Sequence, residues 1–292
     1  MHSKNLFLAL IASILLYVCS PLMASDTLRV CADPDNLPFS NMKLQGFENK
    51  IADVIAKDMH ATIEYTWMRQ RQSFIRQTLG ADRCDVVMGV PRNFDRVLTT
   101  LPYYRSSYVV VTKKKRNLAI RSYDDPMLQD LKVGLHTIGN DGSNSPPATA
   151  MGRHGLAKNI VGFSMWGENK IKNPQGLIVE AVADNEIDLA IVWGPFGGYF
   201  AKKYGDKLTI SPAPVDAGMP SMLFAYDISM GVRKGETQLV EQLETSILHK
   251  RHAIQKILNS YHIPLITQFS ELSETKFNNS SVELLNRKGN YL

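Results

Sequence analysis

Hydrophobic positions in the first third of the chain follow two different spacings. Residues 84–90 (CDVVMGV) form an almost continuous apolar run, and the shorter run at 28–32 (LRVCA) also has the composition of a buried strand. Residues 47–59 carry apolar side chains three and four positions apart, which predicts a helix with one buried face. Segments 61–67 and 73–79 read as a strand and a second helix. The order strand, helix, strand, helix, strand indicates an α/β lobe.

A second series of the same kind begins at Leu131. Strands are predicted at 131–136, 159–166 and 187–194, and helices at 148–156 and 176–186. A loop rich in Gly, Asn, Ser and Pro at 139–147 follows the first of these strands. The chain therefore builds a similar α/β lobe twice.

The last third of the chain returns to regular structure after an irregular stretch at 211–221. A strand is expected within 224–236, followed by helices within 236–248 and 252–262. These elements are predicted to complete the first lobe, and the polar residues beyond 266 to form an extension. The predicted fold class is α/β, with two lobes, each a mostly parallel sheet flanked by helices.

The amino terminus has the pattern of an export signal. Lys4 precedes an apolar run at 6–18, which is short for a membrane span, and a small residue at Ala24 offers a cleavage site. We expect residues 1–24 to be removed and the mature protein to be periplasmic. A signal anchor is the alternative, and the bulky residues before Cys19 disfavour lipidation.

Export to an oxidising compartment bears on whether the cysteines form a disulfide. Once Cys19 leaves with the signal, Cys31 and Cys84 remain, and two cysteines in an oxidising compartment usually pair. Such a bridge would contribute about 4 kcal/mol to stability in the chain-entropy model. Two buried free thiols are the alternative. The Cys and His spacings match no zinc site, so no metal is predicted.

Charge and motifs indicate neither nucleic-acid binding nor catalysis. The net charge is +5, with acidic and basic residues interspersed. The one basic cluster, at 113–116, is interpreted as a solvated linker between the lobes, and a docking patch for an acidic partner protein is the alternative. The chain has no Gly-x-Ser-x-Gly or His-Glu-x-x-His sequence, and its glycine-containing loop at 139–145 lacks the lysine of a phosphate-binding loop. We expect a binding protein rather than an enzyme. A dehydratase on the same fold is the remaining enzymatic alternative.

The order of several short strings resembles the family-3 extracellular solute-binding proteins. They are LRVCADPDNLPFS, GFENKIADVIAKDM, CDVVMGV with Arg96 and Pro102-Tyr103-Tyr104, and SMGVRKGETQLVEQL. The resemblance implies a type II periplasmic-binding-protein-like fold in which two strands cross between the lobes and the solute lies in the cleft. Here the crossings are expected near Val110–Lys113 and Leu223–Asp227. The implied domains are a signal peptide (1–24), lobe 1 (25–111 and 223–266), lobe 2 (112–222) and a carboxyl-terminal extension (267–292).

An amino-acid site needs an arginine for the carboxylate and an acid for the ammonium group. Arg96 lies close to where the family has its arginine, with Arg92 as a competitor and a structural ion pair as the alternative role. The family's acid falls on Trp193 in this sequence, and a tryptophan cannot form the salt bridge. Binding of zwitterionic amino acids is therefore not expected.

A narrower resemblance rests on AIVWGPFGGYFA (190–201), supported by LRVCADPDNLPFSN and DRVLTTLPYYRSSYV. These strings are similar to the solute-binding-like proteins associated with quinoprotein dehydrogenases, including those of methanol oxidation. The resemblance implies a methanol dehydrogenase that uses pyrroloquinoline quinone as partner, and its cytochrome as a further one. It does not imply that this chain holds the quinone, so no cofactor is predicted. A transport receptor for a small solute is the alternative function.

The expected cleft lining is aromatic. Trp193, Phe196 and Tyr199 surround two glycines at the end of a predicted strand, and aromatic surface of this kind is typical of binding sites. Burial in the core of the second lobe is the alternative for these rings. The remaining cleft candidates are Arg96, Phe39 from the Pro-Phe loop, and Tyr103 and Tyr104 beside the first crossing.

Overall fold

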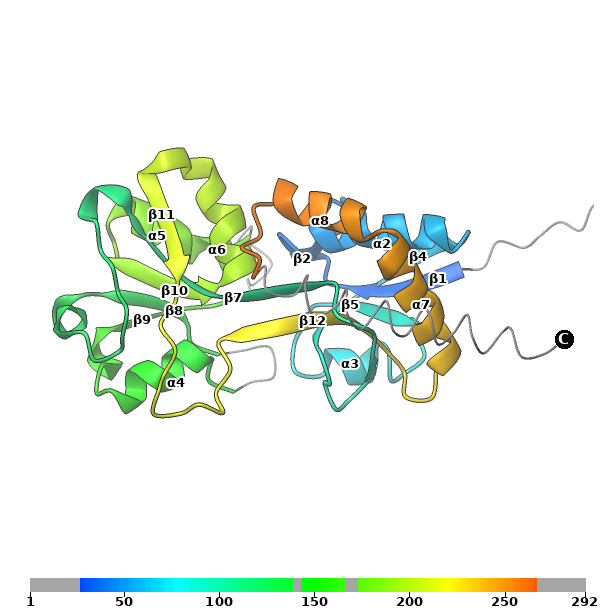
Figure 1. The fold of residues 1–292 in the computed structure, drawn as a ribbon, viewed down its shortest axis with the longest axis horizontal. Helices are drawn as coiled ribbons and strands as arrows, with labels where there is room; N and C mark the ends of the chain where they lie inside the picture. Colours follow the sequence, from blue (N-terminus) through cyan, green and yellow to red (C-terminus); the bar gives the residue numbers. More distant parts are fainter. Residues whose placement is uncertain (1–26, 139–142, 166–172, 267–292) are drawn as a thin grey trace, which may run out of the picture.

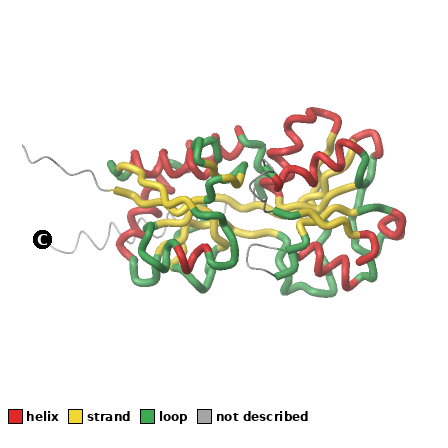
Figure 2. The backbone as a smooth tube through the Cα atoms, turned by 180° about the vertical axis from the view of Figure 1, so that it is seen from behind, coloured by secondary structure: helices red, strands yellow, loops and turns green. Residues whose placement is uncertain are grey.

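Two α/β lobes joined by long strands make up the protein (Figures 1 and 2). The computed structural model describes residues 27–138, 143–165 and 173–266. The predicted signal peptide and the carboxyl-terminal extension lie outside these residues. No helix in the described part is long and apolar enough to cross a membrane.

The sheet of the first lobe has the order β4 (Thr62–Trp67), β1 (Thr27–Ala32), β5 (Val86–Pro91) and β12 (Ala225–Val232). The first three strands are parallel, and β12 runs antiparallel to β5. This lobe also contains the short strands β2 (Asp35–Asn36), β3 (Ser40–Asn41) and β6 (Leu98–Thr99).

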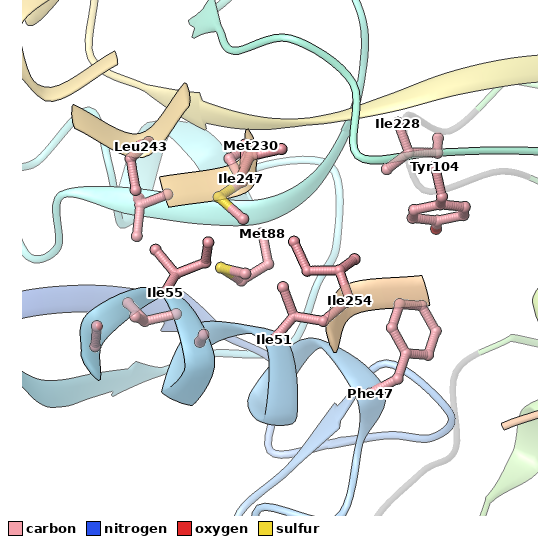
Figure 3. Packing of buried hydrophobic residues seen from close by; sticks show 14 of the residues in the cluster. Phe47, Ile51, Ile55, Met88, Tyr104, Ile228, Met230, Leu243, Ile247 and Ile254 are labelled. Atoms are coloured by element: carbon pink, nitrogen blue, oxygen red, sulfur yellow. The ribbon is translucent and has the colours of Figure 1, made fainter. Parts of the chain in front are cut away.

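Helices α2 (Phe47–Asp58), α7 (Thr237–His249) and α8 (Arg251–Ser260) build the main core of this lobe with the sheet. Figure 3 shows Phe47, Ile51 and Ile55 of α2 facing residues of the sheet and of the last two helices. All three side chains are fully buried, as the helical spacing predicts. The returning carboxyl-terminal helices therefore complete the first lobe.

A smaller core includes the short helix α3 (Phe74–Gln77) and the disulfide between Cys31 and Cys84. The two Cα atoms are 5.5 Å apart and both side chains are buried. The predicted pairing of these cysteines is confirmed.

The second lobe repeats the pattern. Strands β9 (Ile160–Phe163), β8 (Val133–His136) and β10 (Leu189–Trp193) are parallel, while β7 (Tyr104–Lys113) is antiparallel to β10. A further strand, β11 (Leu208–Pro212), pairs with β7; it overlaps the start of the stretch predicted to be irregular. The helices are α4 (Pro146–Arg153), α5 (Leu177–Asp184) and α6 (Gly194–Ala201), and the short 3-10 turns are η1 (Lys114–Arg116), η2 (Pro126–Asp130), η3 (Ala157–Asn159), η4 (Pro174–Gly176) and η5 (Lys202–Lys207).

The lobes are connected where β7 pairs with β12. Residues 104–107 of β7 pair with 228–225 of β12, while residues 109–113 already pair with β10 and β11 of the second lobe. The second crossing overlaps the predicted Leu223–Asp227. The first lies a few residues before the predicted Val110–Lys113, because those residues belong to the sheet of the second lobe. The domain limits at 111, 222 and 266 remain a proposal, and this pairing favours moving the first of them to about 107.

Candidate functional site

The candidate site is the interlobe seam, which we define as the surfaces where loop 33–41 and residues 260–266 of the first lobe meet Gln175 and α6 of the second. The carboxyl ends of β1, β5, β8 and β10 point toward it. In α/β sheets this is the edge where ligands usually bind.

Asp33 holds the loop of the first lobe in place. Its carboxylate accepts hydrogen bonds from the backbone N–H groups of Asp35 (2.8 Å) and Gln70 (2.6 Å), and its backbone oxygen accepts one from Ser40 Oγ (2.8 Å). Burial raises the pKa of Asp33, against the lowering effect of the two backbone hydrogen bonds. The side chain therefore orders the loop that carries Phe39.

Gln175 bridges the two lobes. Its Nε2 donates to the backbone oxygen of Asp35 at 3.1 Å and to Asn36 Oδ1 at 3.0 Å. Gln175 and Asn36 are 3% and 9% exposed. Both hydrogen bonds are thus shielded from water, where they are stronger than on the surface.

Phe39 and Phe196 meet across the seam. Their ring centroids are 5.2 Å apart in an edge-to-face arrangement, and Phe196 also lies 5.5 Å from the ring of His136. Burial lowers the pKa of His136 to about 4, although a hydrogen bond with the backbone of Gln175 opposes this shift. The structure brings these two predicted residues together, beside a histidine that is neutral at pH 7.

Trp193 ends β10 and lies against both crossing strands. Its ring centroid is 5.5 Å from that of Tyr108 on β7 and 5.7 Å from that of Tyr226 on β12, both edge-to-face. The side chain is half-buried and packs against the cores of both lobes. Trp193 therefore occupies the junction of the lobes, with Tyr226 as an aromatic neighbour that the sequence analysis did not identify.

Helix α6 contacts the carboxyl-terminal segment of the first lobe through its glycines. A Cβ on Gly198 would lie 1.9 Å from the backbone oxygen of His262, and one on Gly194 would lie 2.6 Å from Ser106 Oγ. Only glycine permits this approach. Next to it, Tyr199 stacks on Tyr261 with centroids 5.9 Å apart.

Two further hydrogen bonds continue this contact. Lys202 Nζ donates to the backbone oxygen of Ser260 at 3.2 Å, and Ser106 Oγ donates to that of Pro264 at 2.6 Å. The Gly-Pro-Phe-Gly-Gly-Tyr string, singled out from sequence as a cleft lining, thus packs against the first lobe.

Tyr103 and Tyr104 lie within the first lobe. Tyr103 Oη donates to the backbone oxygen of Met88 at 2.8 Å. Tyr104 is 5% exposed, with its ring 5.9 Å from that of Phe47 (Figure 3). Both tyrosines, which the sequence analysis listed as cleft candidates, thus pack within the first lobe.

Arg96 is not brought to the seam. After β5 the chain turns back, and β6 pairs with Gly231 and Val232 at the end of β12 that lies away from the second lobe. Arg96 precedes β6, is exposed, and has its guanidinium 5.9 Å from the ring centroid of Phe94. Its competitor Arg92 stays nearer the crossing, since its backbone N–H donates to Asp227 at 2.8 Å.

Glu48 is a notable acidic residue that the sequence analysis missed. A Cβ on Gly89 would lie 2.2 Å from Glu48 Oε1, so the carboxyl group rests on the glycine of β5. Burial raises the pKa of Glu48 to about 8. A glutamate in the first turn of a helix is an ordinary favourable choice, so the local pattern does not indicate that this carboxyl group packs against β5.

The contacts across the seam are mostly aromatic rings, backbone groups and amide side chains, with Lys202 as a charged donor and Ser106 as a hydroxyl donor. Trp193 lies at this junction, at the position where the sequence analysis expected an acid in an amino-acid site. In the described residues, no three His, Cys, Asp or Glu side chains are grouped so that they could hold a metal ion.

Comparison with known proteins agrees with this architecture. Residues 28–263 match the bacterial extracellular solute-binding proteins, family 3. Protein MoxJ of Paracoccus denitrificans is 29% identical over 263 residues, which span 86% of this chain and 94% of that protein.

Two solved structures extend the comparison. The periplasmic binding protein XoxJ from Methylobacterium extorquens AM1 shares 31% identity, with a TM-score of 0.67 over 82% of this chain and 100% of the other. MxaJ from Methlophaga aminisulfidivorans MPT shares 25% identity, with a TM-score of 0.70 over the same shares.

Proposed function

The chain belongs to the bacterial extracellular solute-binding proteins of family 3, and we propose that it is a periplasmic accessory protein of a methanol dehydrogenase that uses pyrroloquinoline quinone. It binds the dehydrogenase, or a segment of it, and assists maturation or activation. The cytochrome of the same system is a further partner. The protein itself catalyses no reaction and holds no quinone.

The observation that carries this proposal is the similarity to MoxJ, XoxJ and MxaJ over more than four fifths of the chain. The similarity covers both lobes, so it concerns the whole binding architecture rather than a shared fragment.

The chemistry of the seam supports a protein partner over an amino acid. Trp193 replaces the acid that would neutralise an ammonium group, and Arg96 lies on another face. The half-buried side chains of Phe39 and Trp193 instead offer aromatic surface at the meeting point of the lobes, next to the buried ring of Phe196. Aromatic side chains are enriched where proteins bind proteins.

Export to the periplasm is part of the proposal. The apolar run after Lys4 has the length of a signal peptide, and the buried Cys31–Cys84 bridge fits an oxidising compartment.

A pull-down tests this function. Tagged protein is incubated with periplasmic extract of methanol-grown cells, and a quinoprotein dehydrogenase is expected among the recovered proteins. Trp193→Asp places a charge among Tyr108 and Tyr226 and is expected to reduce recovery at least tenfold. Trp193→Phe keeps an aromatic ring and is expected to retain most of it.

Circular dichroism separates loss of binding from loss of folding. The recovery of dehydrogenase by the two variants is compared with that of the parent protein only if both variants keep the far-UV spectrum of the parent. Repeated failure of the parent protein to recover a dehydrogenase refutes the proposed function. Unchanged recovery with Trp193→Asp refutes the placement of the site at Trp193.

One observation favours the alternative, a receptor for a small solute. His136 Nε2, Ser145 Oγ and Gln175 Oε1 are buried polar atoms without a hydrogen-bond partner in the described part of the chain. Ser145 precedes α4, and its N–H donates to Thr137, the residue after His136. A small polar ligand would satisfy such atoms. Thermal-shift screening tests this alternative, because a tightly bound ligand raises Tm by mass action. If no amino acid, organic acid or alcohol raises the Tm of the protein, the result argues against a receptor for a small solute.

A further inference from the structure

A basic hollow lies on the first lobe, apart from the seam residues. Its volume is about 330 Å³, and its lining comes from α3 and the turn after it, the residues before β6 and the turn after β12. The lining residues are Ile75, Arg76, Leu79, Gly80, Arg96, Arg233 and Lys234. Four of the seven are cations and none is an acid. This hollow includes Arg96, the residue expected from sequence to anchor a ligand in the cleft.

One of the four cations is explained by the fold. Arg233 donates to the backbone oxygen of Cys84 at 2.5 Å and to Asp85 Oδ1 at 3.1 Å, and it also pairs with Asp82 at 3.0 Å. Arg233 thus fastens the end of β12 to the start of β5, and its charge is balanced within the chain.

The other three cations are not balanced. Arg76, Arg96 and Lys234 are exposed, and none has an ion pair with an acid in the described residues. Three like charges around one concave surface repel one another and attract an anionic partner.

The floor of the hollow is apolar and fixed. Leu79 is 1% exposed and belongs to the small core that contains the Cys31–Cys84 disulfide, against which Ile75 packs. A floor held by a disulfide and a buried core needs little ordering when a partner binds, which favours affinity.

From these features we infer that the hollow binds an acidic peptide segment of a protein partner. Carboxylates of the segment pair with Arg76, Arg96 and Lys234, and an apolar side chain lies on Ile75, which packs against the buried core that contains Leu79. An apolar floor adds nothing to the binding of a free anion such as phosphate. The cations surround one hollow instead of following a line, which is a poor match to a nucleic-acid backbone. The inference does not depend on the proposed function.

An array of eight-residue peptides tests it with the full chain. The peptides vary systematically from zero to four Asp or Glu and from zero to two Leu, and binding is measured by fluorescence anisotropy at several salt concentrations. Peptides that combine acidic residues with leucine are expected to bind best, and binding is expected to weaken as salt screens the charges.

Variants locate the binding surface. Arg76→Gln, Arg96→Gln and Lys234→Gln are each expected to weaken the best peptide about two- to fivefold, and the triple variant more than tenfold. The triple variant Lys50→Gln, Lys158→Gln, Lys207→Gln is the control, because it removes the same charge at exposed sites outside the hollow. It is expected to change affinity less than twofold.

Three outcomes overturn the inference. In the first, no peptide binds with an affinity that depends on the three cations. In the second, the control variant loses as much affinity as the hollow variant, which indicates a general charge effect. In the third, inorganic phosphate displaces the best peptide at concentrations where chloride does not, which assigns the hollow to small anions.

Discussion

At the scale of single residues, two ionisable side chains next to the seam are held in their neutral forms: Glu48, whose N–H donates to the backbone oxygen of Phe39, and His136, beside Phe196. Burial raises the pKa of Glu48 to about 8 in the first lobe and lowers that of His136 to about 4 in the second. At pH 7 neither side chain carries a full charge.

The raised pKa of Glu48 makes a prediction about stability. The folded state keeps the proton up to about pH 8, while the unfolded chain releases it near pH 4.5, so stability falls as pH rises through this window. Glu48→Gln removes the effect without changing the size of the side chain. Tm is expected to rise by about 3–6 °C at pH 8 and to be unchanged at pH 4.

Differential scanning calorimetry from pH 4 to pH 8 measures this difference. Glu64→Gln, an exposed glutamate on β4, is the matched control and is expected to leave Tm unchanged at both ends. An equal gain from Glu48→Gln at every pH would contradict the buried, protonated carboxyl group.

Single residues also show how far sequence reasoning reaches. The positions of Phe39, Trp193 and Phe196 near the seam were predictable from local pattern, because Trp193 lies at the end of the strand predicted at 187–194, Phe196 follows it, and Phe39 lies in the loop after the strand predicted at 28–32. Arg96 was not, because its position depends on β6 pairing with the far end of β12, a contact between residues more than 130 positions apart. Glu48 was missed because its burial depends on Gly89, on a strand distant in sequence.

At the scale of elements, the contact of α6 with the first lobe depends on a missing side chain. Gly198→Ala places a methyl group 1.9 Å from the backbone oxygen of His262. Residues 260–264 would have to move away from α6. We expect a loss of about 1–3 kcal/mol in unfolding free energy, as for other overpacked sites, despite the better helix propensity of alanine.

Urea denaturation of the two glycine variants measures this cost. Gly152→Ala is the control, since its Cβ within α4 meets nothing within 4 Å. That variant is expected to gain up to about 1 kcal/mol. An equal gain in unfolding free energy for Gly198→Ala and Gly152→Ala would show that the close contact of α6 with His262 does not contribute to stability.

Most elements were predictable because their apolar spacing is local. Strand β5 illustrates the limit: its pairing with β12 shifts register between Ser229 and Gly231. Met88 then packs in the main core and Val90 in the disulfide core. Such a bulge changes which face a residue occupies, and a continuous apolar run gives no sign of it. Strand β11 was missed for a similar reason, since its pattern is half exposed and its pairing partner is distant.

At the scale of the whole molecule, the two lobes contact each other directly at three places. Gln175 donates hydrogen bonds to loop 33–41, and Phe39 packs on Phe196. Helix α6 packs closely against residues 260–264. We expect these direct contacts to hold the lobes in one arrangement when no solute is bound.

These contacts predict the shape of the protein in solution. Small-angle scattering of the ligand-free protein should match the closed arrangement, and added amino acids should leave the radius of gyration unchanged. Combining Gln175→Ala with Phe196→Ala removes the buried bridge and the aromatic contact, so the radius should increase as the lobes part about β7 and β12. The control pair, Gln238→Ala with Met127→Ala, alters exposed side chains and should not change it. If the parent protein scatters as an open form that closes with a solute, the contacts at the seam depend on a ligand, and the receptor function gains the stronger support.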